Sequence, residues 1–289
     1  MKGCTASLLF LLCLAATALP AQTTIGGVAC TSTALSGTYA VSLTARQVTA
    51  AGAYTGVFQS NGSASFDGES GVTINLTANT GKATATPLTW SGTYSVQANC
   101  AGVINITSGG SATLNLAIYR VGANPVTFNF LLSGSDSTYT YSGTGNTTPA
   151  TACTAATFSG VYTFSGTGFA LTSGNVSGAE NGAGLMQFDG VSAITVNLTM
   201  WAGAAAASPL ALTGSYSVSA ACLGTATLTD ASNNSYVMSF SIYNNSVANA
   251  AAYTTLTQSS KFLVSGAIHT AYGQPSTTAA VQAAQGGRA

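Results

Sequence analysis

Two Asp-Gly pairs are the residues of this sequence whose type and spacing most clearly suggest chemistry. Asp67 and Gly68 lie in SFDGESGVTINLT, and Asp189 and Gly190 lie in QFDGVSAITVNLT, at an offset of 189 − 67 = 122 residues. A recurring aspartate can be a general acid, a calcium ligand or the tip of a hairpin. Because both residues tolerate positive φ and a strand-like run follows each pair, we predict that Asp67-Gly68 and Asp189-Gly190 are hairpin turns.

Paired carboxylates of the kind that glycosidases use occur in only one of these segments. Glu69 follows Asp67, but Val191 stands at the equivalent position of the second segment. The single histidine, His269, has no counterpart earlier in the chain, and neither a G-x-S-x-G elbow nor a D-x-D-x-D-G calcium loop is present. We therefore assign no catalytic, cofactor-binding or metal-binding residue, and we expect a protein that is not an enzyme and uses no cofactor.

Aromatic residues are the remaining candidates for a functional role. Trp201 follows a strand-like run and is expected to be exposed, so it is a candidate contact for a sugar ring or another ligand. Trp90 has the inward parity of its strand and aligns with Leu212, which indicates a core residue. Six other aromatic residues recur at equivalent apolar positions and are predicted to pack in the core: Tyr39, Phe66, Tyr94, Tyr162, Phe188 and Tyr216.

These residues belong to two tandem copies of one unit. CTSTALSGTY from Cys30 matches CTAATFSGVY from Cys153 at an offset of 123, and PLTWSGTYSV from Pro87 matches PLALTGSYSV from Pro209 at an offset of 122. Offsets that stay nearly constant along the chain indicate a tandem duplication with small insertions in turns. We predict one repeat over residues 22–148 and a second over residues 149–270.

Each unit has the alternating pattern of half-buried strands. In the opening segment Val72, Ile74 and Leu76 fall on one face, and the polar residues between them fall on the other. No convincing amphipathic helix is present. About eight such runs are expected in the first unit, near residues 36–46, 55–66, 71–79, 88–99, 102–108, 112–120, 125–133 and 137–144. The sequence therefore predicts an all-β protein of two antiparallel units, each an up-and-down barrel, with a β-sandwich as the alternative.

Four cysteines remain once the N-terminal segment is set aside. Cys30 and Cys100 are 70 residues apart, and Cys153 and Cys222 are 69 residues apart. Four cysteines allow three pairings, and the duplication favours Cys30–Cys100 and Cys153–Cys222. In a meander the start of the first strand and the end of the fourth lie at the same end, so this pairing needs no distortion.

The N-terminal segment indicates a location outside the cytoplasm, and the low charge of the chain agrees with it. Residues 1–21 have the apolar stretch and small residues of a secretory signal peptide, with cleavage after Ala18 or after Ala21 both fitting the pattern.

Removal of this segment takes away Lys2 and leaves 6 − 1 = 5 basic residues against 6 acidic residues. So few charges exclude a basic surface for nucleic acid, and no later apolar run predicts a membrane span. Residues 271–289 are expected to form a disordered tail.

The units resemble known families at two levels. The run of Leu-Ser-Gly-Thr-Tyr39, Phe66-Asp-Gly68 and Gly92-Thr-Tyr-Ser-Val96, repeated in tandem, resembles uncharacterised secreted repeat proteins of environmental bacteria. The opening Gly37-Thr-Tyr39 and Gly160-Val-Tyr162 are more distantly similar to the first strand of calycin barrels, the lipocalin and avidin superfamily. That resemblance implies a barrel whose interior can hold an apolar ligand, and it transfers no binding residue, because the tryptophans of avidin-type sites are missing.

The sequence indicates a broad function rather than a specific one. We expect a secreted, non-catalytic protein with a structural or binding role at or outside the cell surface, extracellular or periplasmic. The alternatives are a carrier of a small apolar ligand inside the barrels, and an adhesin that binds carbohydrate or self-associates through its Thr and Asn faces.

Overall fold

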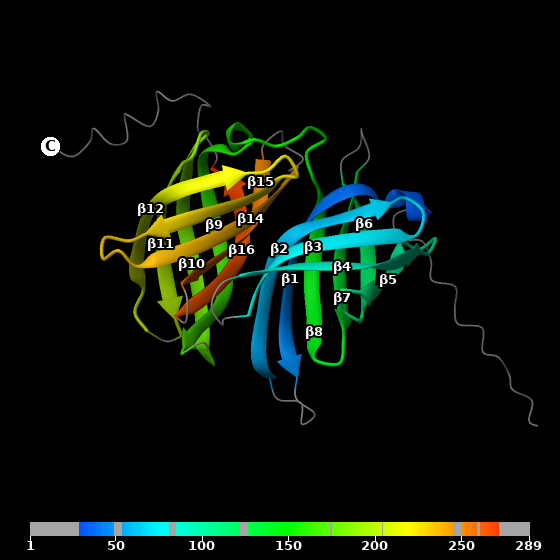
Figure 1. Cartoon of the computed structure of the whole chain (residues 1–289), viewed down its shortest axis with the longest axis horizontal. Helices are drawn as coiled ribbons and strands as arrows, with labels where there is room; N and C mark the ends of the chain where they lie inside the picture. Colours follow the sequence, from blue (N-terminus) through cyan, green and yellow to red (C-terminus); the bar gives the residue numbers. More distant parts are fainter. Residues whose placement is uncertain are drawn as a thin grey trace, which may run out of the picture.

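The structure is a computed structural model that describes residues 29–48, 54–80, 85–121, 127–173, 175–203, 205–244, 250–258 and 261–271. The predicted signal peptide lies outside the described residues, and so does the predicted tail apart from Ala271. The described chain is all-β and forms two closed eight-stranded antiparallel barrels that lie side by side (Figure 1). The predicted fold class is confirmed, with a barrel rather than a sandwich in each unit.

Each barrel is an up-and-down meander in which every strand pairs with its neighbours in the chain and the last strand closes onto the first. Barrel 1 comprises η1 (Ser32–Ala34), β1 (Ser36–Val48), β2 (Tyr54–Asp67), β3 (Gly71–Asn79), β4 (Thr86–Val96), β5 (Ala101–Ser108), β6 (Ala112–Val121), β7 (Thr127–Ser135) and β8 (Tyr139–Thr147). Barrel 2 comprises η2 (Ala155–Thr157), β9 (Ser159–Thr172), β10 (Asn175–Asp189), β11 (Ala193–Ala202), β12 (Ser208–Val218), β13 (Leu223–Thr229), β14 (Ser235–Asn244), β15 (Ala250–Gln258) and β16 (Phe262–Thr270).

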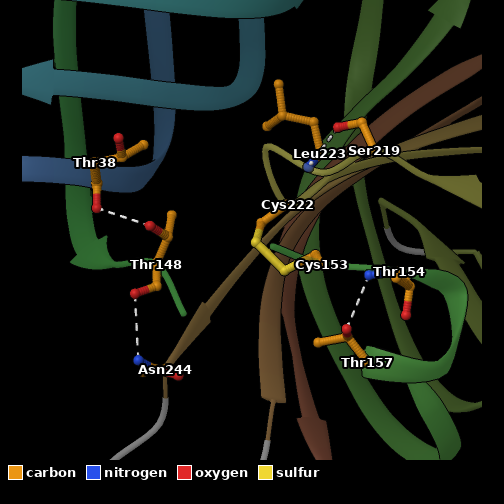
Figure 2. Close-up of a disulfide and its surroundings, with 9 residues drawn as sticks. All are labelled: Thr38, Thr148, Cys153, Thr154, Thr157, Ser219, Cys222, Leu223 and Asn244. Atoms are coloured by element: carbon orange, nitrogen blue, oxygen red, sulfur yellow. Dashed lines mark hydrogen bonds between the residues drawn. A yellow bond between two sulfur atoms is a disulfide. The ribbon is translucent and has the colours of Figure 1, made fainter. Parts of the chain in front are cut away.

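One disulfide joins the first strand region of each barrel to the turn after its fourth strand. The bonds are Cys30–Cys100 and Cys153–Cys222, which confirms the predicted pairing. Figure 2 shows the second of them beside the inter-barrel link at Thr148. A cross-link that closes a loop of this length contributes about 4 kcal/mol in the chain-entropy description.

Aromatic rings fill the disulfide end of both interiors. In barrel 1 the Phe66 ring centroid lies 5.5 Å from Tyr39, 4.9 Å from Tyr94 and 5.6 Å from Phe130. In barrel 2 Phe188 makes the equivalent contacts with Tyr162 and Tyr216. The further ring is Phe240 on β14, the sixth strand of its barrel, whereas Phe130 lies on the seventh strand of barrel 1. The six recurring aromatic residues and Trp90 are all buried, as predicted.

Two of the inward rings, Phe130 and Phe240, lie over a glycine of the neighbouring strand. A Cβ placed on Gly145 would lie 2.1 Å from the Phe130 ring, and one placed on Gly224 would lie 2.1 Å from the Phe240 ring. Each barrel therefore fits a large ring by leaving one neighbouring position without a side chain.

Two short 3-10 turns, absent from the sequence prediction, close this end of the barrels. The Tyr94 hydroxyl donates to the carbonyls of Ser32 (3.1 Å), the first residue of η1, and of Leu35 (2.9 Å), which follows η1. The Tyr216 hydroxyl contacts the carbonyls of Ala155 and Phe158 around η2 in the same way. In each barrel a buried tyrosine hydroxyl thus finds a hydrogen-bond partner, and the bond ties the 3-10 turn to the fourth strand. The turns were missed because three residues carry no periodic signal.

The two barrels are joined by a buried polar contact centred on Asn61 of β2. Its Nδ2 donates to the Ser239 carbonyl (2.7 Å), and it lies 3.0 Å from Ser239 Oγ and 3.2 Å from Thr255 Oγ1. Asn61 and Ser239 face outward from their own barrels, yet both are buried. Part of the polar outer face that the alternation would place in water therefore packs against the other barrel.

Apolar side chains flank this contact on both sides. Ala40 packs with Tyr243, Ala251 and Tyr253. Val57 belongs to a separate cluster with Leu171 and Leu263, against which Phe169 packs. We call the contact region between the two barrels the seam. Further along it, Asn244 Nδ2 donates to the Thr148 carbonyl, and the Thr148 hydroxyl donates to the Thr38 carbonyl (Figure 2). The residue that follows β8 is thereby tied to both barrels.

Replacing Asn61 by alanine is expected to destabilise the docked barrels by about 1 kcal/mol, because it removes the buried hydrogen bond to barrel 2 while the Ser239 carbonyl still accepts from Thr254 Oγ1. The measurement is urea unfolding followed by circular dichroism. Asn75→Ala is the matched control, because Asn75 is exposed on the outer face of the adjacent strand β3. Equal stability of the two variants would contradict the role given to Asn61.

Candidate functional site

The first Asp-Gly pair forms the β2–β3 turn through the aspartate side chain. Asp67 Oδ1 accepts the amides of Glu69 (2.7 Å) and Ser70 (2.9 Å), and Oδ2 accepts the amide of Gly71 (2.8 Å). Gly68 has φ +85°, whereas Asp67 is not among the residues with positive φ. The connection has three residues, 68–70, so it differs from the two-residue turn in which both Asp and Gly take positive φ. The aspartate contributes its carboxylate rather than an unusual backbone conformation.

All four aspartates of the chain act as turn acceptors. Asp189 Oδ1 accepts the amides of residues 191–193, Asp136 accepts the amides of Thr138 and Tyr139, and Asp230 accepts those of Ser232 and Asn234. Hydrogen bonds to the Asn234 side chain and to neighbouring groups lower the pKa of Asp230 to about 2. A carboxylate held by several donors is a weak base and a poor proton donor at neutral pH.

Hydrogen bonding to the Glu69 amide, with the amides of Gly71 and Ser70, lowers the pKa of Asp67 below its ordinary value of 3.8. The stability that Asp67 provides is therefore fully present above that value and is lost as the pH falls through the lower folded pKa. We expect Asp67→Asn to lower the melting temperature at pH 7, and the difference from wild type to shrink as the pH falls below 3.8. A pH series of thermal melts measures this, and a difference independent of pH would contradict it.

The other residues considered for catalysis do not assemble into a site. His269 is exposed on β16, where it faces Thr163 in the ladder, and Glu69 is exposed at the β2–β3 turn. In the described part of the chain, no group of three or more His, Cys, Asp and Glu side chains could hold a metal ion.

Glu180 is the one unexpected carboxylate. It is 7% exposed and shares the inward parity of Met186 and Phe188 on β10, opposite Gly168 and Ala202 in the ladder. No hydrogen bond or ion pair connects its carboxylate to another described residue, and burial raises its pKa.

The repeat offset could have revealed this residue. Glu180 aligns with Phe58 at 180 − 58 = 122, the same offset that relates Phe188 to Phe66. Phe58 packs against Tyr139 and Tyr141 in the interior of barrel 1, with ring centroids about 6 Å apart. A carboxylate at an aromatic interior position is therefore the sequence signal for a buried charge.

Replacing Glu180 by glutamine is expected to stabilise the protein at pH 7. A folded pKa raised above the ordinary value of 4.5 means that wild-type stability falls as the pH rises from 4.5 through the folded pKa. The Gln variant lacks this fall, so its advantage appears at neutral pH and disappears below pH 4.5. Glu69→Gln, at an exposed carboxylate, is the control in a pH series of thermal melts. A Glu180→Gln variant no more stable than wild type at pH 7 would contradict a buried charge.

A groove of about 440 Å³ lies between the barrels, on their outer faces. Barrel 1 contributes residues of β1, β2 and β8, and barrel 2 contributes residues of β9 and β10. Its lining is mainly polar and includes Thr44, Arg46, Gln59, Ser142, Thr167 and Asn181. Pockets at domain interfaces with convergent polar groups are common ligand sites. This groove is the candidate functional site.

The buried part of the groove is formed by Gln59. It is 3% exposed, and its Nε2 donates to the Thr167 carbonyl of barrel 2 (3.3 Å). Its Oε1 is buried and has no hydrogen-bond partner. Arg46 of β1 lies across the seam with its guanidinium 5.9 Å from the centroid of the Phe169 ring. Both residues thus contact the opposite barrel.

Trp201, the candidate ligand contact, lies beside this groove. It is 38% exposed and faces Asn181 directly in the β10–β11 ladder, so both side chains project from the outer face of barrel 2. Side chains at such paired positions are neighbours. The structure therefore brings Trp201 next to a groove residue, although nothing in the sequence links it to Arg46 or Gln59.

The two walls of the groove come from equivalent positions of the repeats. Thr44 aligns with Thr167 and Arg46 with Phe169 at an offset of 123, and Gln59 aligns with Asn181 at an offset of 122. Divergence at equivalent positions has produced a cation facing a ring. The site requires both copies.

No protein-family model matches the chain, and a search of curated proteins finds no similar sequence. Among the described residues, no helix has the length and apolar character needed to cross a bilayer.

Proposed function

We propose that this is a secreted, non-catalytic protein with a structural or binding role at or outside the cell surface, exercised through its outer faces. The observation that carries the proposal is that side chains occupy the barrel interiors while the described groove lies between the barrels. Recognition then takes place on the surface of the paired barrels rather than inside either one.

The packing of the interiors supports this proposal over a carrier of an apolar ligand. Beyond the cluster of rings around Phe66, the Trp90 ring lies edge-on to Tyr141, with centroids 5.5 Å apart, and Tyr141 also contacts Phe58. In barrel 2 the interior includes Glu180, whose carboxylate is unfavourable for an apolar ligand.

The absence of catalysis is supported by the chemistry of the carboxylates. Asp67 and Asp189 are the best sequence candidates for an acid, but both oxygens of Asp67 and Oδ1 of Asp189 accept turn amides. Efficient acid–base catalysis at neutral pH requires a pKa near the working pH, and hydrogen bonding lowers both of these pKa values.

Secretion is supported by the two disulfides, which form and persist in oxidising compartments such as the periplasm or the extracellular space. The apolar segment within residues 1–21 agrees with export.

The up-and-down topology also supports the proposed distant relationship to calycin barrels.

Carbohydrate binding is the second candidate, and Trp201 favours it. An exposed indole beside a groove of hydroxyl and amide groups can contact the apolar face of a sugar while polar groups bind its hydroxyls. The groove therefore gives the adhesin alternative a specific location.

The proposal is tested by incubating the purified mature protein with a panel of glycosidase, esterase and peptidase substrates. We expect no turnover above buffer, and no difference between wild type and the Asp67→Ala/Asp189→Ala variant. Robust turnover that is lost in this double variant would overturn the proposal.

A further inference from the structure

We propose that the groove between the barrels binds a hexuronic acid, either as a free sugar acid or as the end of a uronate-containing glycan. This inference rests on the proposed binding role and names its ligand class. The ligand would lie across the seam, with its carboxylate near Arg46 and its hydroxyls toward Gln59 and Asn181.

The charge of the groove points to an anionic ligand. Of the residues described as lining it, Arg46 alone is charged, so a bound carboxylate meets a guanidinium and no lining carboxylate. Arginine binds carboxylates in a planar, two-point geometry, and such charge-assisted hydrogen bonds are stronger than neutral ones. The contact of Arg46 with Phe169 places this cation at the boundary between the barrels.

The uncharged polar groups of the groove point to a hydroxylated ligand. Gln59 Oε1 is a buried acceptor without a hydrogen-bond partner, and a ligand hydroxyl is a donor that would satisfy it once the side chains covering it move aside. Its Nε2 is already committed to the Thr167 carbonyl, which fixes the orientation of the amide. A fatty acid supplies a carboxylate but no such donor. A sugar acid supplies both.

Trp201 adds the third element of sugar recognition. Its exposed ring lies next to Asn181, so a sugar bound along the groove has an aromatic surface at the rim of barrel 2. The groove volume of about 440 Å³ falls in the range of roughly 300–1,000 Å³ typical of small-molecule pockets.

The experiment is a titration of Trp fluorescence with galacturonic acid, digalacturonic acid and neutral galactose, repeated by calorimetry. Trp201 is exposed and Trp90 is buried in barrel 1, so a Trp201→Phe variant identifies the responding residue. Arg46→Ala removes the carboxylate partner, and Asn181→Ala removes an exposed amide. Arg120→Ala is the matched control, because Arg120 is exposed on β6 and is not a groove residue.

We expect saturable binding of the two acids and no saturable binding of galactose. Arg46→Ala should weaken binding of the acids at least tenfold, and Asn181→Ala and added salt should also weaken it. Arg120→Ala should leave the affinity unchanged. Tighter binding of digalacturonic acid would identify a glycan as the source of the ligand, and equal binding a free sugar acid. The inference is overturned if wild type gives no saturable response by either method, if galactose binds as tightly, or if Arg46→Ala behaves like Arg120→Ala. None of these negative results affects the turnover assay, so the proposed non-catalytic function would stand or fall separately.

Discussion

Closure of an eight-strand meander is the constraint on which the rest of the structure depends. Once β8 pairs with β1 and β16 with β9, each side chain of a regular strand lies either inside a narrow interior or on the outer surface. Some of the large rings in this interior, such as Phe130 and Phe240, fit because a neighbouring glycine, Gly145 or Gly224, makes room. Outside the interiors, two closed barrels form between them a groove that neither has alone, and it is there that we propose recognition.

The part of the fold governed by this alternation could be predicted from sequence. Runs such as Val72, Ile74 and Leu76 locate the strands, and the duplication resolves the pairing of the cysteines, because both depend on short-range periodicity or on a constant offset. The docking of the barrels could not be predicted in this way. An outward Asn61 looks the same in sequence whether it faces water or Ser239, 178 residues away.

The candidate site was accessible to sequence reasoning only in fragments. Trp201 was recognised as an exposed aromatic, but the groove beside it depends on Arg46 and Phe169, which meet only when the barrels are docked. The aspartates were located correctly in turns because an Asp-Gly pair is a local signal. Their mode of action, a carboxylate that accepts successive backbone amides, is a property of side-chain geometry that the pair alone does not specify.

The burial of Asn61 also affects how the protein can be produced. Asn61, Gly62 and Ser63 form an N-x-Ser acceptor sequence for N-linked glycosylation. The nitrogen that would carry the glycan is the atom that donates to Ser239 between the barrels. A host that attaches an oligosaccharide there before folding would fill the seam with sugar and hold the two barrels apart, even though each could close and form its disulfide.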